Sequence, residues 1–547
     1  MFKENNLHLQ ESFLTSKVWM NNSIRERLIR SWASVFYNIV FSGIDEKIFS
    51  ILYCQDNGRP NFPVNILLSL EYIKHLFDYS DAELIEQFYY NYQIAFALGI
   101  NNVGEINLAP STLYEFRKKI YQYATDHPED GDLIFKQFIE LTKAFAKESD
   151  VAVDDQRMDS TMISANIKNA GRLALAFDVL EQTLKALPEE LLTESQKEYL
   201  GDGYRNKLLY KCKGNQIVSK LQEILDTCTT VLDAVSNMPE ILDLNEIKVL
   251  KRFIDEQTDL NKDTGRRIVK ANKSIKANSL QSAYDEDATY RKKAKKEGKG
   301  YVVNIAETCN ENNGVQYITD YDVAPNIASD VDFAKDRIPV IKTNFEIKDA
   351  YVDGGYFGKD VEEVANKNDV TMHYTDMTGK KPDDESIPVN KFELNDDNTV
   401  KVCPAGNDPQ RTSYNCEKDL INAHFSKEVC DNCEFKDKCC VEEQAKMYKF
   451  STTVEAIETQ NKREEIKESI KENSSKRTAI EGTNSELKRA HGLDDVKVKG
   501  IIKVTITTGM KITACNFKRF AKNAIENLRK KSASPNIINL QGIVLQI

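Results

Sequence analysis

The stretch Val151-Ala-Val-Asp-Asp-Gln-Arg-Met-Asp159 divides two regions with different residue patterns. Its apolar and polar residues alternate with a period of two, which predicts a β-strand. Residues 1–148 before it carry apolar side chains at helical spacing, which predicts an all-α region. Helical patterns return over residues 171–279, and strand-like patterns follow them. A strand, a long helical excursion and further strands together predict an α/β core with a large helical insertion.

Three later strands are predicted at Gly300–Ala306, Val315–Tyr321 and Ile347–Asp353, and helical patterns follow after residue 453. These changes divide the chain into six expected segments. They are a helical N-terminal domain (1–148), the first part of the core (149–170), the helical insertion (171–279), the core strands (280–395), a small cysteine-rich insertion (396–445) and a C-terminal region with helices and basic residues (446–547).

Two local signals mark helix starts in the N-terminal region. Ser80 followed by Glu83 predicts a capping box. Pro110 opens a second helix that carries Arg117 on an amphipathic pattern. The end of one helix, followed by a basic amphipathic helix, is typical of a helix-turn-helix unit, but ordinary helical packing explains the same pattern equally well.

The composition describes a globular protein of several structural units. The chain has 547 residues, of which 41% are hydrophobic and 29% charged. No apolar run approaches the ~18 residues that a membrane span requires, and the N-terminus lacks a secretory pattern, so we expect a cytoplasmic protein without membrane contact. The net charge of −11 argues against a basic surface overall, although the runs Arg291–Lys299 and Lys518–Lys531 are locally basic and suit a DNA backbone.

Three carboxylates stand in contexts that favour metal chemistry. Asp159 ends the first predicted strand, and the glycines after Asp353 end another strand and leave that carboxylate at an open edge. Glu481 lies in the run Arg477-Thr-Ala-Ile-Glu481-Gly-Thr-Asn-Ser-Glu-Leu-Lys488, where offsets of four and seven place three charged side chains on one helix face. Two or three carboxylates suffice to hold the pair of divalent cations, ~3.5–4 Å apart, that serves phosphodiester chemistry. Arg477 and Lys488 would then contact phosphates.

Simpler explanations exist for each of these residues. An aspartate at a strand end often caps a turn, and Arg477 with Glu481 can form an ordinary surface ion pair. Asp154 and Asp155 compete with Asp159 for the first position. The hypothesis therefore depends on the order and context of all three carboxylates together.

These segments resemble those of bacterial insertion-sequence transposases that carry an Asp-Asp-Glu (DDE) triad. Met158–Asn166 is similar to the strand of the family's first aspartate, and Tyr351–Gly358 to the turn of its second. Arg477, Glu481 and Lys488 match the Arg-x3-Glu-x6-Lys signature of one subgroup. That signature usually includes a tyrosine three residues before the arginine, where this chain has Ser474.

The resemblance extends beyond the carboxylates. Ser80–Leu84, Leu98–Ile100 and Pro110–Arg117 are similar to the N-terminal domain common in these transposases, and Tyr301–Ala306 resembles the second strand of their core. It implies a ribonuclease-H-like fold in which Asp159, Asp353 and Glu481 bind two Mg²⁺ (or Mn²⁺).

The resemblance also implies an activity and its partners. The protein would bind double-stranded DNA at terminal inverted repeats, expose a 3′-hydroxyl by cleavage and join it to target DNA. A homodimer associated with the bacterial nucleoid is the expected working unit. Two alternatives remain open: a nuclease of the same fold that does not join strands, and an inactive DNA-binding protein descended from a transposase.

The cysteines indicate a second kind of metal site. Six of the eleven lie between positions 403 and 440. The pair Cys430-x2-Cys433 has the spacing of a Zn²⁺ clamp, which Cys403 with Cys439 or Cys440 would complete. Such a site would be structural, with Cys416 and His424 as spare candidates and unligated thiols as the alternative. A similar cysteine pattern accompanies some of the resembled transposases. The sequence has no Walker-type phosphate loop, so we expect no nucleotide cofactor.

Overall fold

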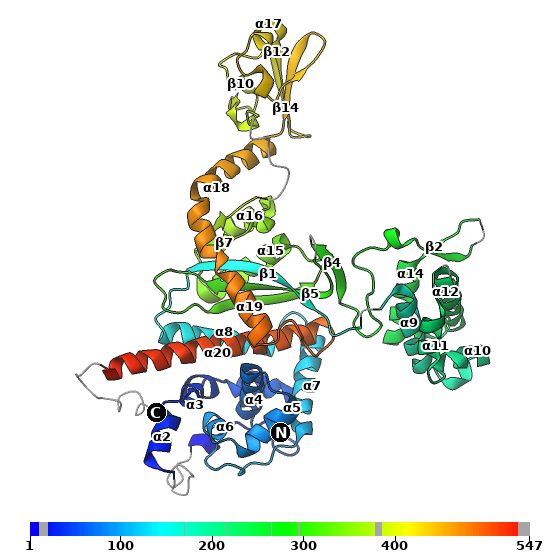
Figure 1. Ribbon diagram of the computed structural model, residues 1–547, viewed down its shortest axis with the longest axis vertical. Helices are drawn as coiled ribbons and strands as arrows, with labels where there is room; N and C mark the ends of the chain where they lie inside the picture. The colour runs from blue at the N-terminus through cyan, green and yellow to red at the C-terminus, as the bar shows by residue number, and fades with distance from the viewer. Residues whose placement is uncertain are drawn as a thin grey trace. The chain divides into compact units, whose positions relative to one another are not determined.

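The computed structural model describes residues 1–9, 20–168, 170–214, 216–263, 265–293, 296–377 and 386–533. They form two compact units, whose elements are labelled in Figure 1. The first unit combines Met1–Ile347 with the described chain from Ile480 onward, and the second unit is Lys348–Ala479. Helices and strands are both present and the N-terminal region is helical, as the sequence predicts. Among the helices of the described residues, none is both long and apolar enough to cross a membrane.

The first unit begins with helices. The predicted capping box is confirmed, because the Ser80 side chain accepts from the Glu83 N–H while the Glu83 carboxylate accepts from the Ser80 N–H. The helix predicted to open at Pro110 is also confirmed. The N-terminal elements are η1 (Leu7–Leu9), α2 (Asn22–Ile29), α3 (Trp32–Phe36), η2 (Tyr37–Phe41), η3 (Glu46–Leu52), α4 (Val64–Phe77), α5 (Asp81–Tyr90), α6 (Tyr92–Ala97), α7 (Pro110–Asp126) and α8 (Leu133–Glu148).

Arg117 on α7 forms ion pairs with two carboxylates of the neighbouring helices. Its guanidinium donates to Glu71 at 2.8 Å and to both oxygens of Asp81 at 2.8 and 2.7 Å. These ion pairs hold α4, α5 and α7 together and lower the pKa of Asp81, against the effect of its burial. The basic residue that favoured a helix-turn-helix reading therefore serves helical packing.

The sheet of the first unit is built around strand β5 (Lys296–Thr308). β1 (Asp155–Ser164) pairs with it antiparallel over residues 300–308, and β6 (Ile318–Pro325) pairs antiparallel along its other edge. β4 (Thr289–Lys293) forms a hairpin with the start of β5, so the basic run Arg291–Lys299 lies largely on paired strands rather than on a loop. β1 begins four residues later than the predicted strand and continues to Ser164, because this segment stays paired with β5. Asp159 consequently lies in mid-strand, opposite Ile305.

Between β1 and β4 the chain forms a separate helical layer with its own core. Helices α9, α12 and α14 bury apolar residues such as Leu180, Ile224 and Phe253 against one another. The elements of this insertion are α9 (Arg172–Ala186), η4 (Glu189–Leu191), α10 (Glu194–Lys197), η5 (Glu198–Leu200), α11 (Tyr204–Lys211), α12 (Gln216–Ala234), α13 (Pro239–Leu242), α14 (Asn245–Gln257), β2 (Thr258–Leu260), β3 (Arg267–Val269) and η6 (Asn272–Ser274).

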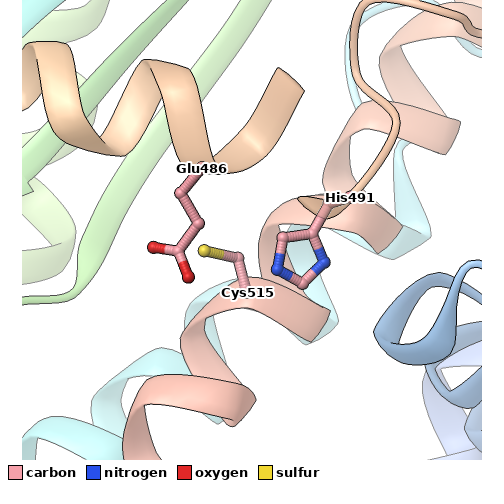
Figure 2. Close-up of side chains that lie close together, drawn as sticks. All are labelled: Glu486, His491 and Cys515. Carbon is pink, nitrogen blue, oxygen red and sulfur yellow. The ribbon is translucent and has the colours of Figure 1, made fainter. Parts of the chain in front are cut away.

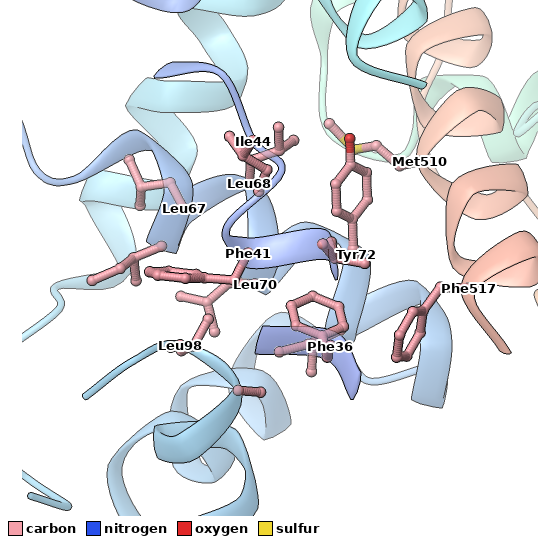
Figure 3. Close-up of a cluster of buried hydrophobic side chains, with 14 of the residues drawn as sticks. Phe36, Phe41, Ile44, Leu67, Leu68, Leu70, Tyr72, Leu98, Met510 and Phe517 are labelled. Carbon is pink, nitrogen blue, oxygen red and sulfur yellow. The ribbon is translucent and has the colours of Figure 1, made fainter. Parts of the chain in front are cut away.

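Three helices complete the first unit: α15 (Asp330–Phe345), α19 (Ile480–Ala490) and α20 (Ile501–Ala533). In Figure 1, α8 and α20 run along one face of the sheet, with the N-terminal helices on their other side. α20 inserts Met510 and Phe517 among the apolar side chains of the N-terminal helices (Figure 3). The basic run Lys518–Lys531 lies near the end of α20, whose described residues from Val504 on are mostly buried.

The second unit contains a parallel strand pair and a small antiparallel sheet. β7 (Asp349–Val352) and β8 (Thr371–Tyr374) are parallel, connected by η7 (Gly354–Tyr356) and α16 (Lys359–Lys367). The small sheet has the order β11-β12-β14-β13 and is followed by the long helix α18 (Val454–Thr478). The remaining elements of the second unit, including the four strands of this sheet, are η8 (Val389–Lys391), β9 (Glu393–Leu394), β10 (Val400–Val402), β11 (Arg411–Asn415), β12 (Leu420–Ser426), α17 (Lys427–Asp431), η9 (Lys436–Lys438), β13 (Glu442–Glu443) and β14 (Met447–Thr452).

Candidate active site

Asp159 and Glu481 belong to the first unit, where helix α19 packs on strand β1. Asp159 is 7% exposed, and its Oδ2 accepts a hydrogen bond of 2.9 Å from the Asn484 side-chain amide. Glu481 lies three residues before Asn484, which puts the two side chains on neighbouring positions of one helix face. Glu481 itself is exposed. The first unit thus offers one buried, oriented carboxylate and one accessible carboxylate on the helix beside it.

Lys488 connects the same helix to the same strand. Its Nζ donates to the carbonyl oxygen of Met162 at 2.6 Å and lies 3.6 Å from Asp494 Oδ1. The side chain is 25% exposed. Two contacts within the protein therefore engage the ammonium group that the sequence assigned to a phosphate.

A buried ionic network connects α19 to strand β5 and helix α20. Glu307 on β5 is fully buried and accepts from Arg157 at 2.8 and 2.6 Å, from the Thr483 hydroxyl at 2.6 Å and from Arg519. Arg519 also donates to Thr483 at 2.8 Å and to Glu486 at 3.1 and 2.9 Å. Arg519 had been counted among the basic residues suited to DNA, whereas it joins α19, α20 and β5 inside the protein. Since a buried charge without partners costs several kcal/mol, the network holds α19 firmly in place.

Asp353 and Arg477 belong to the second unit. Asp353 directly follows β7, and its Oδ1 accepts from the Gly355 N–H at 2.8 Å, so the two glycines end the strand as predicted. Arg477, near the end of α18, places Nη2 3.6 Å from Asp353 Oδ2. The Asp353 side chain is 33% exposed, and the Arg477 side chain is 17% exposed. The predicted carboxylate and the predicted phosphate ligand are thus neighbours.

Two further contacts fasten the end of α18 to the parallel strands. Lys476 donates to the Tyr351 hydroxyl at 2.8 Å, and the Asn473 amide donates to the Tyr374 carbonyl at 3.3 Å. Asn473 is almost completely buried. These contacts set the position of Arg477 beside Asp353.

The prediction that Arg477, Glu481 and Lys488 share one helix face is wrong. α18 ends at Thr478 and α19 begins at Ile480, so Arg477 lies on one helix and the other two residues on the next. The break is at Ala479, whose N–H donates to the Arg477 carbonyl instead of continuing the regular helical pattern.

The cysteine-rich segment encloses a small cavity of about 30 Å³ in the second unit. Cys403, Cys430, Cys433 and Cys439 all line this cavity, whereas Cys440 and Cys416 do not. The Phe435 N–H donates to Cys433 Sγ at 3.4 Å, and the Asn407 amide to Cys403 Sγ at 3.8 Å. Burial and then the neighbouring thiols raise the pKa of Cys430 to about 11. The four cysteines that line this cavity offer thiol ligands, which suit a soft or borderline cation such as Zn²⁺.

Several positioning residues carry no signal in the sequence. Asn484, Thr483 and Glu307 are polar residues within otherwise ordinary helix and strand patterns. The only available hint is distance along the helix, because Asn484 lies one turn after Glu481.

Two family models match the chain. One, described as a transposase DDE domain, matches residues 402–521, a range that includes Glu481, Lys488 and the cysteine cluster. The other, described as a transposase domain (DUF772), matches residues 25–119 within the N-terminal helices. No curated protein and no solved structure matches the chain. The two family matches confirm the predicted resemblance to insertion-sequence DDE transposases.

Proposed function

We propose that the chain is the DNA transposase of an insertion sequence, which binds the element's terminal inverted repeats, cleaves DNA and transfers the strand to a target. The observation that carries this proposal is the transposase DDE match over residues 402–521, which contains Glu481 on a helix fixed against the strand of Asp159. Transposases act on DNA, so double-stranded DNA is the partner. Because two element ends must be brought together, we propose a homodimer as the working unit.

We propose that Asp159, Asp353 and Glu481 bind two Mg²⁺ (or Mn²⁺) on a ribonuclease-H-like core. All three donors are carboxylates, the ligands that hard divalent cations prefer. Bound cations of this kind activate an attacking oxygen and stabilise the leaving oxygen of a phosphodiester. The sheet with Asp159 on its strand β1, and the parallel pair that ends at Asp353, support this assignment of the core.

The surrounding residues have distinct parts in this proposal. Asn484 orients the Asp159 carboxylate, and Lys488 anchors α19 to β1 through the Met162 carbonyl. Arg477 is placed to contact a phosphate next to Asp353, since its guanidinium lies beside that carboxylate and remains partly exposed. Lys488 thus acts as a positioning residue rather than as the phosphate ligand expected from its spacing.

The test is cleavage and strand transfer on DNA carrying the element's own ends, with Mg²⁺, by the wild type and Glu481→Gln. The substitution keeps the size of the side chain but removes a charge that binds metal. We expect activity to fall at least about 100-fold, because the metal's charge stabilisation is worth several kcal/mol. Glu468→Gln, at an exposed glutamate of α18, is the matched control and should keep full activity.

The products separate the alternatives. Joined DNA identifies a transposase, and cleavage without joining identifies a nuclease of the same fold. If the wild type binds the ends but leaves them intact under all metal conditions, the protein is a DNA-binding descendant of a transposase. Equal activity of wild type and Glu481→Gln would remove Glu481 from the site.

We propose in addition that Cys403, Cys430, Cys433 and Cys439 bind one structural Zn²⁺. All four line one small cavity, and N–H groups directed at two of the sulfur atoms favour thiolates. Replacing Cys433 by Ser should remove one zinc per chain, measured by elemental analysis of the purified protein. Cys416→Ser is the control, because this exposed cysteine lies outside the cavity; an unchanged zinc content in Cys433→Ser would contradict the site.

A further inference from the structure

A second group of metal-binding side chains lies in the first unit, away from the cysteine-rich segment. Glu486 on α19, His491 just after that helix and Cys515 on α20 each place one ligand atom within 4.8 Å of the other two. Figure 2 shows the three side chains converging from these separate backbone segments. The donors are a carboxylate oxygen, an imidazole nitrogen and a sulfur, which are the ligand types found at zinc.

The histidine supplies an independent indication that something is bound. His491 is completely buried, and its Nδ1 lies 3.0 Å from the His75 carbonyl oxygen. Nδ1 must carry the proton and donate, because a carbonyl only accepts, so Nε2 is left with a lone pair. Nε2 is also buried and has no hydrogen-bond partner among the described residues. An unsatisfied buried acceptor destabilises the folded protein, and a cation at this position would remove that penalty.

The tautomer of His491 is the one that a metal ligand needs. Histidines that bind metals through one nitrogen commonly donate from the other to a backbone carbonyl or a carboxylate. In this protein the acceptor is the backbone carbonyl of His75, near the end of α4. The ring is therefore held in orientation before any ligand arrives.

Cys515 and Glu486 complement the imidazole. Cys515 is fully buried, so its sulfur is shielded from solvent. Coordination of a divalent cation would displace the proton of its thiol. Glu486 Oε2 is held by Arg519 at 2.9 and 3.1 Å, whereas Oε1 lies 3.7 Å from Lys518 Nζ, beyond hydrogen-bond distance. Oε1 is thus the carboxylate oxygen available to a ligand.

We propose that Glu486, His491 and Cys515 bind one Zn²⁺ ion. Bond lengths of ~2.0–2.3 Å at tetrahedral angles set ligand atoms ~3.5 Å apart, so the distances between the three ligand atoms would shorten by about 1.3 Å or less. The Glu486 side chain is 29% exposed, which leaves a path for a water molecule as fourth ligand. The inference does not rest on the proposed function, since all three residues belong to the first unit and none is among the proposed catalytic carboxylates.

The ion would join three elements. Through Glu486 it holds α19, through Cys515 it holds α20, and through His491 and its contact with His75 it reaches α4. Glu481 lies five residues before Glu486 on the same helix. The site therefore positions the helix that carries the proposed catalytic glutamate.

The first test is the zinc content of the purified full chain. Cys515→Ser should contain one zinc ion per chain fewer than the wild type. Cys228→Ser, which alters an equally buried cysteine of α12, should keep the wild-type content. The cysteine-rich segment is intact in all three proteins, so the difference between them reports only this site. An equal zinc content in Cys515→Ser and wild type would overturn the proposal.

A second test needs no variant and remains decisive if Cys515→Ser does not fold. Crystals of the unaltered protein grown with zinc should give an anomalous difference peak, at the zinc absorption edge, within bonding distance of His491 Nε2, Cys515 Sγ and Glu486 Oε1. The location of the peak distinguishes this ion from one held by the cysteine-rich segment or by the proposed catalytic carboxylates. A map with zinc elsewhere and none between these atoms would refute the site.

Discussion

Asn484 is the residue through which helix α19 reaches Asp159. A buried aspartate in mid-strand needs a partner, and the Asn484 amide supplies a hydrogen bond without adding charge. That hydrogen bond fixes the direction of one oxygen of the Asp159 carboxylate. Asp159, Asp353 and Glu481 were recognisable in the sequence because each stands in a short local pattern. Asn484 was not, since its partner is 325 residues away along the chain.

Replacing Asn484 by Ala should lower DNA cleavage by about 10–100-fold, the usual effect of removing a residue that orients a metal ligand. The physical reason is that the Asp159 carboxylate loses the hydrogen bond from the Asn484 amide and turns more freely. The measurement is the initial cleavage rate at several Mg²⁺ concentrations, where the loss should be partly restored at high Mg²⁺. Asn527→Ala, at an exposed position of α20, should behave as wild type. A rate for Asn484→Ala equal to that of this control would show that Asp159 is oriented otherwise.

Asp132 makes the stability of the first unit depend on pH. Burial raises its pKa to about 6, although the N–H groups at the start of α8 favour the charged form. The folded state therefore holds the proton more tightly than the unfolded state, whose pKa is about 3.9. The contribution of Asp132 to the free energy of unfolding should be highest below about pH 4 and fall, by at most about 3 kcal/mol, as the pH rises to about 6.

The comparison that isolates this effect is urea unfolding of wild type and Asp132→Asn between pH 4 and 8. Asn keeps a side-chain oxygen that can accept from the Phe135 N–H at the start of α8 but does not titrate. The difference in unfolding free energy between the two proteins should change across the stated range and stay constant above it. A difference independent of pH would mean that Asp132 has an ordinary pKa in the folded protein.

At the level of elements, the strands were easier to predict than the ends of the helices. Gly300–Ala306 falls within β5, and its short, largely apolar run rich in β-branched residues is typical of a strand that is buried throughout. The helical region after residue 453 was recognised, but the break at Ala479 was not, since alanine is a strong helix former and nothing local marks the end. Where tertiary contacts decide a boundary, the residue pattern alone is insufficient.

The packing of α20 against strand β6 explains why residue 509 is a glycine. A Cβ at this position would lie 2.0 Å from the Tyr321 hydroxyl oxygen, so the helix and strand β6 approach closely only because the side chain is absent. Gly509→Ala should therefore destabilise the protein by about 1–3 kcal/mol, as overpacking does. At Gly482 of α19, no atom of the described residues lies within 4 Å of the corresponding position, apart from the chain neighbours and the helix's own backbone, so Gly482→Ala should stabilise by up to about 1 kcal/mol. Thermal unfolding of both variants measures these opposite signs; stabilisation by both would refute the close contact.

At the level of the whole molecule, the first unit is closed by residues from both ends of the chain. The ring of Phe517 on α20 packs edge-on against Phe36 on α3, with 4.9 Å between their centroids, and Phe520 stacks on Phe145. Figure 3 shows Phe517 and Met510 among the side chains of the N-terminal helices. The sequence predicted both regions as helical, but not this pairing, because apolar helix faces do not specify their partners.

Phe517→Ala should lower the free energy of unfolding by about 3–5 kcal/mol, the usual cost of removing a buried aromatic ring. Trp32 packs against Phe36, so tryptophan fluorescence during urea unfolding reports on this core. Tyr210→Ala, which removes a ring that is 78% exposed, should change stability by about 0.5 kcal/mol or less. If the two variants were equally stable, α20 would not be part of the N-terminal core.

The contact between Phe36 and Phe517 also bears on how the protein is made. The partners are 481 residues apart, which at about 5–20 residues per second corresponds to roughly 25–100 s of translation. Throughout that time the N-terminal helices leave the ribosome without the helix that covers them. Until α20 has been synthesised, the apolar residues that it covers remain exposed, and a chain that ends before Phe517 cannot bury them. The N-terminal core therefore closes only after this helix has been made.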